Sequence, residues 1–381
     1  MPEHPPCCGN TFFAILIFVA QRQQTVYQVV PMKNHTIKTP DKDSKAFYAL
    51  LLCIFLCIII SIGAGALLGS ADLSFKDIAD VFKLKLFGIK SPALKASSVF
   101  IVWNLRLPRA LLAIIAGGGL AICGAAMQSI TQNVLADPYI LGISSGASAA
   151  VSFALFLGTP LSLLQWGLPL FAFGGAFASL ILVYGIGASG RSSSSTRLVL
   201  AGIAVSVVLA AFTQLFMILS PSDGIMRSII SWMMGSLAGA RWDNLLIPTI
   251  GVLSCSCVFL FLAGAFNVIS LGDETAISLG VNIHTIKKAT IILTALITGI
   301  LVSSCGIIGF VGFIIPHIVR LIRGSDHRKL FPLCFLTGGL FLIWMDVLAR
   351  TLLAPQEVPI GIFTSLCGGP FFIWLLKRQM K

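Results

Sequence analysis

Few side chains in this sequence could do chemistry, and the most conspicuous are arginines beside long apolar runs. Arg106 and Arg109 stand in "RLPR", immediately before an apolar segment, and Arg350 ends "DVLAR" after another. A guanidinium presents planar, permanently charged donors that can bind a carboxylate through two hydrogen bonds. An arginine at a helix end can also simply anchor that end at the membrane interface. The residue types therefore allow a carboxylate-binding surface or a set of helix anchors.

Two further ionisable residues lie inside apolar runs, where such groups are candidate functional residues. Asp346 precedes Arg350 by four positions, so the two share a helix face and we expect an ion pair rather than proton coupling. His317 follows Pro316 in "IIPHIVR". We interpret it as a packed, hydrogen-bonded histidine, and a haem or iron ligand is the less favoured alternative.

The cysteine pattern indicates no metal or redox centre. The sequence holds ten cysteines, and the eight from Cys53 to Cys367 form no CxxC pair and have no accompanying histidines. Most lie inside or beside apolar runs, where a thiol packs as a small apolar side chain. We therefore expect no metal site and no cofactor.

Catalytic motifs are missing from the sequence as well. It has no GxxxxGKS or GxxxxGKT phosphate loop, no HExxH motif and no acidic cluster in an apolar run that could relay protons. The polar stretch "GASGRSSSST" lacks the lysine that would meet a phosphate. We predict that the chain is not an enzyme and does not hydrolyse ATP by itself.

The composition indicates that membrane-spanning helices position these residues. Of 381 residues, 57% are hydrophobic and 10% charged, and the mean hydropathy is +0.96. Soluble domains are roughly 45–50% apolar and 25% charged. The net charge of +12 comes from basic residues spread between apolar runs, as the positive-inside rule would leave them. We therefore predict a polytopic membrane protein and expect no nucleic-acid partner.

Ten apolar runs are candidate spans, since a spanning helix needs about 20 residues. An even number of spans places both termini on one side, and the basic residues of the short loops favour the cytoplasm for that side. The basic residues of the long first outer loop are not explained by this rule. The expected spans are 46–69, 108–130, 141–158, 168–188, 197–219, 245–266, 286–305, 307–322, 331–353 and 359–376.

Residues 1–45 are predicted to be an N-terminal cytoplasmic lead, and residues 46–381 to form the transmembrane domain. The apolar stretch in "TFFAILIFVA" is too short to span a membrane and lacks the basic start and cleavage site of a signal peptide. We interpret the lead as over-extended, with translation beginning at Met32.

A faint internal repeat relates spans two and seven. The stretch "IAGGGLAICG" at residues 115–124 aligns with "ITGILVSSCG" at 297–306. Because the two spans are five apart, a true repeat would be inverted. Inverted repeats are typical of transporters.

Several long motifs, in order, carry a resemblance to a known family. They include "NLRLPRALLAIIAGGGLAICGAAMQSITQNVLADPYILGISSGA", "STRLVLAG", "WMMGSLAG", "GDETAISLGV" and "GIIGFVGFIIPHIVRLIRGSDHRKLFP", followed by the segment from Asp346 to Leu376. Over about residues 50–376 the chain resembles FecCD-type, or type II, ABC importer permeases, which import iron-siderophores, haem and vitamin B12. The resemblance implies an all-α fold of about ten transmembrane helices, in the bacterial cytoplasmic (inner) membrane.

The resemblance also implies partners and cargo. It implies a permease subunit that works with two copies of a separate ATP-binding subunit, an extracytoplasmic substrate-binding protein and a second permease chain, identical or paralogous. An iron-siderophore complex is the expected cargo, and haem or cobalamin is the alternative. An ion-coupled secondary transporter would need a charged site near the membrane midplane, and a membrane enzyme would need a nucleophile or metal constellation.

Roles for individual residues follow from the same resemblance. Arg106, Arg109 and Arg350 are expected to dock the binding protein, unless they only anchor helix ends. Ser195 and Thr196 match a cytoplasmic pathway gate, although plain loop residues would look the same. The ATPase-coupling helix, or otherwise an ordinary amphipathic loop helix, is expected between two glycine breakers and comprises Gly272, Asp273, Glu274, Thr275, Ala276, Leu279 and Gly280.

Overall fold

The computed structural model describes residues 40–379, with the exception of 70, 72, 90, 93, 159–160 and 188–194. The chain divides into two compact units, Met1–Ala49 and Leu50–Lys381, and the packing described below is that of the second. The predicted start at Met32 lies outside the described residues. Of the predicted lead, only residues 40–45, which begin the first described helix, lie inside them.

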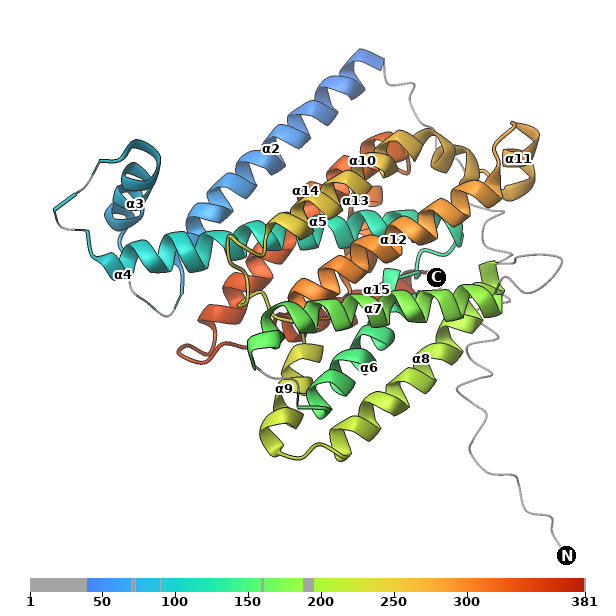
Figure 1. Cartoon of the computed structure of the whole chain (residues 1–381). Coiled ribbons are helices and arrows are strands. Elements are labelled where there is room, and N and C mark those ends of the chain that lie inside the picture. Colours follow the sequence, from blue (N-terminus) through green and yellow to red (C-terminus); the bar gives the residue numbers. More distant parts are fainter. Residues whose placement is uncertain are drawn as a thin grey trace, which may run out of the picture. The chain divides into compact units, whose positions relative to one another are not determined.

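Secondary structure in the described residues is helical without any strand, which confirms the predicted all-α class (Figure 1). The helices are α2 (Pro40–Leu67), α3 (Phe75–Phe87), α4 (Ala96–Val99), the π-helix η1 (Phe100–Arg106), α5 (Leu107–Ile130), the 3-10 helix η2 (Pro138–Leu141), α6 (Ile143–Phe156), α7 (Leu161–Gly187), α8 (Ser195–Ile218), α9 (Asp223–Met233), α10 (Leu246–Ile269), α11 (Asp273–Ser278), α12 (Ile283–Cys305), α13 (Val311–Arg323), α14 (His327–Thr351) and α15 (Ile360–Gln379).

Among the described residues, eight helices are long and apolar enough to cross a membrane, and each corresponds to one predicted span. The other two predicted spans, 141–158 and 307–322, correspond to α6 and α13, which have only 14 and 13 residues. The prediction ran too long there because apolar residues continue into irregular backbone; Ile308, just before α13, is 1% exposed. Non-helical backbone is tolerated at membrane depth where protein surrounds it.

The second predicted span begins earlier than expected. Helical structure runs without a break from Ala96 to Ile130, through α4, η1 and α5, whereas the prediction started at residue 108. Pro108 lies inside this helical stretch, although proline lacks an N–H and clashes with the carbonyl one turn before it. The π-helix η1 directly precedes α5 and widens the helical turn before Pro108, so the proline fits without breaking the helix. Arg106 and Arg109 therefore lie within a helix rather than in the loop before one.

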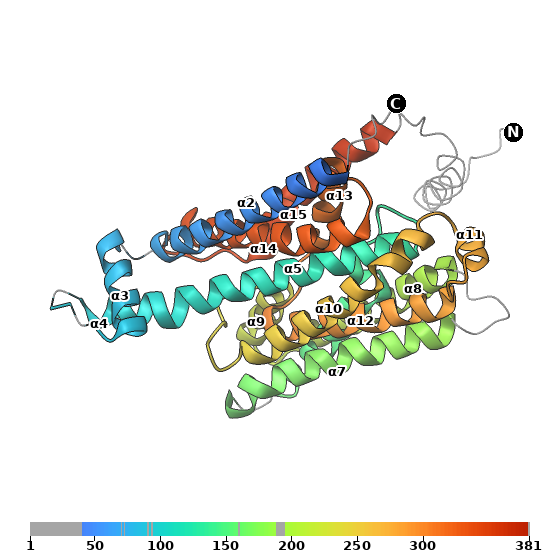
Figure 2. The same ribbon diagram turned by 90° about the horizontal axis from the view of Figure 1, so that it is seen from above.

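Helix α5 occupies the centre of the described bundle. It packs against α13 and α14 on one side and against α10 and α12 on the other (Figure 2). A Cβ on Gly117 would contact the carbonyl oxygen of Gly338 in α14, and a Cβ on Gly119 would lie 2.8 Å from Val252 in α10 and 3.1 Å from Ile297 in α12. The Gly117–Gly119 run therefore packs closely against its neighbours, since glycine, which has no side chain, allows these helices to approach so closely.

Replacing Gly117 by alanine is expected to destabilise the protein by about 1–3 kcal/mol, the typical cost of overpacking a tight contact. The new methyl group would meet backbone, which cannot turn away as a side chain can. The measurement is the thermal unfolding midpoint of the detergent-purified protein.

Gly174 in α7 provides the matched control, because nothing lies within 4 Å of a Cβ built there. Gly174→Ala should be neutral or slightly stabilising, since alanine favours helix over glycine. If Gly117→Ala and Gly174→Ala unfolded at the same temperature, the contact between α5 and α14 would not require glycine at position 117.

Candidate functional site

A buried charge cluster joins α5 to α14 and to the loop after α14. Arg109 donates from Nε to Asp346 Oδ1 at 2.6 Å, and from Nη1 to the two Glu357 oxygens at 3.1 and 2.9 Å. Arg350 Nε lies 3.0 Å from Asp346 Oδ2, as an ion-pair contact, which confirms the predicted pairing of these two residues. Asp346, whose side chain is 3% exposed, thus neutralises two guanidiniums that would be costly to bury alone.

Two of the arginines also bind the carboxyl end of α2. Arg106 donates to the carbonyl oxygens of Ala66 and Leu67 at 2.7 and 2.9 Å, and Arg350 donates to that of Gly65 at 3.1 Å. The last carbonyl groups of a helix have no partner within the helix, so basic side chains can cap them. The arginines therefore link the end of α2 to α5 and α14.

The three arginines that were predicted together line one cavity of about 220 Å³ with Glu357. Each is 6–8% exposed and donates at least one hydrogen bond to an acceptor of the same chain. Glu357, whose side chain is 47% exposed, is the member of the cluster that reaches the surface. Sequence analysis missed it, because a lone acidic residue in "APQEVP" gives no sign that it meets Arg109. The docking role of the three arginines stays a prediction.

The segment expected to couple to an ATPase forms a short, well-bounded helix. Gly272 and Gly280 flank α11 with φ angles of 108° and 80°, which confirms their predicted role as breakers. Ala276 is buried against Ile269 and Ile283. Asp273 accepts a hydrogen bond from Lys287 of α12 at 2.7 Å, which ties the first turn of α11 to the next helix.

Three apolar side chains on and beside α11 are exposed. Leu271, Ile277 and Leu279 are 66%, 65% and 61% exposed, and Glu274 and Thr275 are exposed beside them. Exposed leucine and isoleucine side chains at a helix–loop junction are suited to contact with another protein. The coupling role of this segment stays a prediction.

The predicted gate residues stand at the beginning of α8. Helix α8 starts at Ser195 and continues through Thr196. The side chains of both residues lie outside the described part of the structure, so their role also stays a prediction.

Two adjoining cavities of about 520 and 500 Å³ lie beside α9. They share Met233, Met234 and Ile307; the first also borders α6 and α8, and the second borders α15. No charged residue lines either cavity, and the Ser148 hydroxyl on the wall makes no hydrogen bond within the described residues. The other polar or thioether side chains on the two walls are Ser144, Ser145, Thr213, Gln214, Met217 and Ser365.

Sequence analysis did not identify these wall residues. Serine, threonine and methionine are ordinary components of membrane helices, so their types and spacing carry no distinguishing signal. Only the packing of α6, α8, α9 and α15 around the two cavities reveals them.

No metal centre is found among the described residues, in which no group of three or more His, Cys, Asp or Glu could hold an ion. The eight cysteines in this part of the chain are free thiols. His317 packs edge-on against Phe371, with ring centroids 5.6 Å apart.

Comparison with known proteins agrees with this architecture. A hemin transport system permease protein of Yersinia pestis is 36% identical over 331 residues, which cover 86% of this chain and 95% of the relative. An Fe(3+)-citrate import system permease protein of Bacillus subtilis (strain 168) is 34% identical and covers 90% of this chain and 98% of its own length.

A solved structure gives the same result in three dimensions. A chain described as belonging to an inward-facing ABC transporter of metal-chelate type superposes with a TM-score of 0.75 at 30% identity, over 87% of this chain and 99% of that one. The family model of the FecCD transport family matches residues 52–378. The chain therefore belongs to the FecCD transport family.

Proposed function

We propose that this chain forms the translocation pathway of an ATP-driven ABC importer for iron chelates, with an iron-siderophore complex as cargo. The observation that carries the proposal is the uncharged wall of hydroxyl, amide and thioether groups around the two cavities beside α9. A pathway with such a wall would let a bulky chelate pass without binding it tightly. An ion-coupled transporter, in contrast, needs an ionisable site within the membrane. The relatives named for hemin and Fe(3+)-citrate point to cargo of the same kind.

The distribution of basic residues supports an orientation with α11 on the cytoplasmic side. The carboxyl ends of α5, α10 and α13 meet the first turns of α12 and α14 at this end, where Asn267 bonds to Asp326 at 2.7 Å and Arg320 bonds to Gln128. By the positive-inside rule, an end rich in lysine and arginine faces the cytoplasm, together with both termini. The basic residues here are Lys287, Lys288, Arg320, Arg323, Arg328 and Lys329.

In the working assembly, α11 docks into one of two ATPase subunits on the cytoplasmic side, and a second permease chain, identical or paralogous, completes the pathway. The exposed residues Leu271, Ile277 and Leu279 supply the apolar contact with the ATPase. Ser195 and Thr196 narrow the pathway at the start of α8. ATP binding and hydrolysis by the partner would then move the helices through the contact between Asp273 and Lys287.

At the other end, the arginine cluster receives a carboxylate of the substrate-binding protein. Glu357 already occupies the fork of Arg109 and is half exposed, so an incoming carboxylate can take its place. Docking would thus replace the ion pair of Arg109 with Glu357 by an ion pair of Arg109 with the binding protein, and Arg109 would never be left without a carboxylate. Exchange of this kind gives orientation and a fast encounter more than raw affinity.

Glu357→Gln is expected to tighten docking of the binding protein severalfold, because it removes the competing charge and leaves Arg109 with Asp346. The contribution of a partly exposed pair is about 1 kcal/mol or less, which sets this scale. The measurement is the dissociation constant of the co-encoded binding protein at low and high salt. Unchanged affinity at low salt would mean that Glu357 and the partner do not share Arg109.

The transport proposal is tested in proteoliposomes that contain the permease with its co-encoded ATPase, the binding protein being added outside. Radiolabelled ferric siderophore, hemin and cobalamin are offered in parallel, with and without internal ATP. We expect ATP-dependent accumulation of the ferric siderophore. Accumulation driven by a proton gradient without the ATPase would overturn the mechanism, and ATP-dependent uptake of hemin or cobalamin alone would overturn the cargo.

A further inference from the structure

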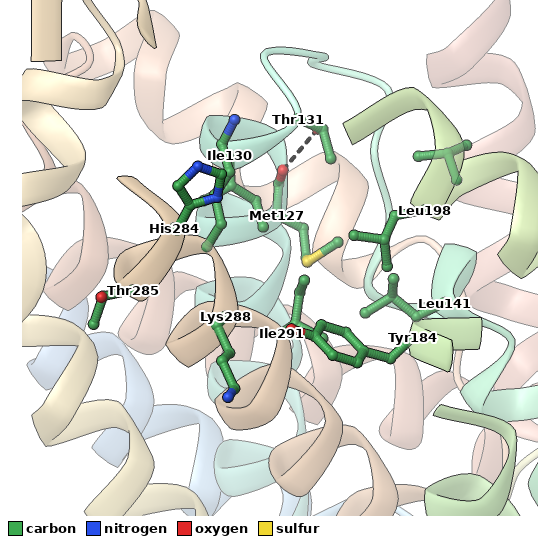
Figure 3. Close-up of a pocket in the computed structure, with 12 residues that line it drawn as sticks. Met127, Ile130, Thr131, Leu141, Tyr184, Leu198, His284, Thr285, Lys288 and Ile291 are labelled. Atoms are coloured by element: carbon green, nitrogen blue, oxygen red, sulfur yellow. Dashed lines mark hydrogen bonds between the residues drawn. The ribbon is translucent and has the colours of Figure 1, made fainter. Parts of the chain in front are cut away.

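A third cavity, of about 210 Å³, is drawn with its lining residues in Figure 3. It lies at the end of the bundle that carries α11, because the first turns of α12, which follows α11, line it. It is enclosed by the carboxyl end of α5, by η2, by the last turns of α7 and by the first turns of α8 and α12. None of its lining residues belongs to the arginine cluster or to the two cavities beside α9. The functions argued above use one of its lining residues, Lys287, but give the cavity itself no role.

The interior of the cavity is largely apolar, with the phenol of Tyr184 in α7 as a polar group among its lining residues. The side chains of Met127, Leu141, Leu198 and Ile291 converge on it from α5, η2, α8 and α12 (Figure 3). The hydroxyl of Thr131 donates to the Met127 carbonyl oxygen at 2.7 Å, so its proton is already used within the chain. An apolar wall of this kind favours hydrocarbon. The volume is below the roughly 300–1,000 Å³ of pockets for drug-sized ligands, so it fits a segment of one chain rather than a whole large ligand.

The rim of the cavity is basic. His284, Lys287 and Lys288 line it from the first turns of α12, and no aspartate or glutamate is among its lining residues. Lys288 is exposed, whereas Lys287 is half-buried and donates to Asp273 of α11. An amphiphile with an anionic headgroup fits this cavity, because its hydrocarbon chain would contact the apolar interior and its headgroup would lie beside the basic rim. Basic pockets between membrane helices on the cytoplasmic side bind anionic lipid headgroups.

We propose that this cavity binds one anionic phospholipid of the cytoplasmic leaflet. An acyl-chain segment lies against Met127, Leu198 and Ile291, and the lipid phosphate lies beside Lys288 and His284. The assignment to the cytoplasmic leaflet rests on the proposed orientation, whereas the binding chemistry rests on the cavity itself.

Lipid in this site would affect two moving parts of the transporter. A phosphate near Lys287 competes with Asp273 for the same ammonium group, and so it changes how firmly α11 is tied to α12. Leu198 and Val199 on the cavity wall follow Ser195 and Thr196 in the first turns of α8, with Arg197 between the two pairs. An acyl chain against them would brace the first turn of α8.

The test is native mass spectrometry of the full chain in detergent, titrated with dioleoyl phosphatidylglycerol or dioleoyl phosphatidylcholine. The two lipids have the same chains and differ in headgroup charge. We expect the wild-type protein to retain phosphatidylglycerol preferentially. One lysine near an anionic headgroup corresponds to about a fivefold change in binding, so Lys288→Gln should weaken phosphatidylglycerol binding by about that factor.

Two further variants make the test specific. Lys377→Gln, at an exposed lysine near the end of α15 and outside the cavity, should leave binding unchanged. Leu198→Trp, which fills the cavity, should lower retention of both lipids, with the unfolding midpoint measured as a check on folding.

Equal losses for Lys288→Gln and Lys377→Gln would overturn the site, since the effect would then be that of surface charge in general. Displacement of phosphatidylglycerol by equimolar inorganic phosphate would also overturn it, because the apolar wall would then contribute nothing. The experiment needs neither ATPase nor cargo. Its outcome is therefore separate from that of the transport proposal.

Discussion

Asp346→Ala is expected to destabilise the protein by about 3–5 kcal/mol, the usual cost of removing one partner from a buried ion pair. Its carboxylate is the shared counter-ion of Arg109 and Arg350, which are 8% and 7% exposed. Without it, Arg109 keeps Glu357, but Arg350 keeps only the carbonyl groups at the end of α2. The measurement is thermal unfolding followed by a thiol-reactive dye, because Cys123, Cys305 and Cys334 are buried in the folded protein.

Two controls separate charge from packing in this experiment. Glu357→Gln removes a carboxylate that is 47% exposed and should cost about 1 kcal/mol or less. The triple variant Arg109→Met, Asp346→Leu, Arg350→Met should regain much of the lost stability, because buried ion clusters can be replaced by apolar residues of similar volume. If Asp346→Ala unfolded at the wild-type temperature, the cluster would contribute nothing to the fold.

Ile277→Asp is expected to reduce ATP-driven uptake and recovery of the ATPase subunit at least about tenfold, the scale of a central interface residue. Ile277 is 65% exposed on the outer face of α11, whereas Ala276 holds the inner face against the bundle. The substitution therefore leaves the folded chain intact and places a charge where docking would exclude water. The measurements are co-purification of the ATPase and uptake in proteoliposomes.

Leu86→Asp is the matched control for this prediction. Leu86 lies in α3, which belongs to the first predicted outer loop, and is 63% exposed. It should leave ATPase recovery unchanged, and both variants should unfold at the wild-type temperature. Normal ATPase recovery with Ile277→Asp would assign the coupling contact to another segment and leave α11 as an ordinary loop helix.

Local features of the fold were predictable from the sequence because each depends on neighbours along the chain. The ion pair of Asp346 with Arg350 could be predicted because residues four apart share a helix face. The ends of α11 could be predicted because glycine readily adopts the positive φ found at Gly272 and Gly280. Predicted helix ends were wrong where tertiary packing overrode local preference. Pro108 is carried inside a continuous helix by η1, and apolar residues before α13 belong to buried, irregular backbone.

The candidate sites divide in the same way. Arg106, Arg109 and Arg350 were identified by their positions beside apolar runs, but their internal partners were not. Arg109 and Asp346 are 237 residues apart in the chain, and nothing in the type or spacing of Glu357 predicts that it completes the cluster. The cavities beside α9 and the cavity beside α12 are enclosed by several helices, so no single segment describes them.

The sequence by itself determined that this is a helical membrane protein of the FecCD family, because hydropathy and motif order are properties of the chain read in one dimension. The tertiary structure alone decided which charges from distant segments are paired, where cavities lie and which side chains of α11 stay exposed. The physical reason is that a buried charge or cavity wall is defined by atoms that converge from distant segments. Close glycine contacts such as Gly117 with Gly338 bring those segments together.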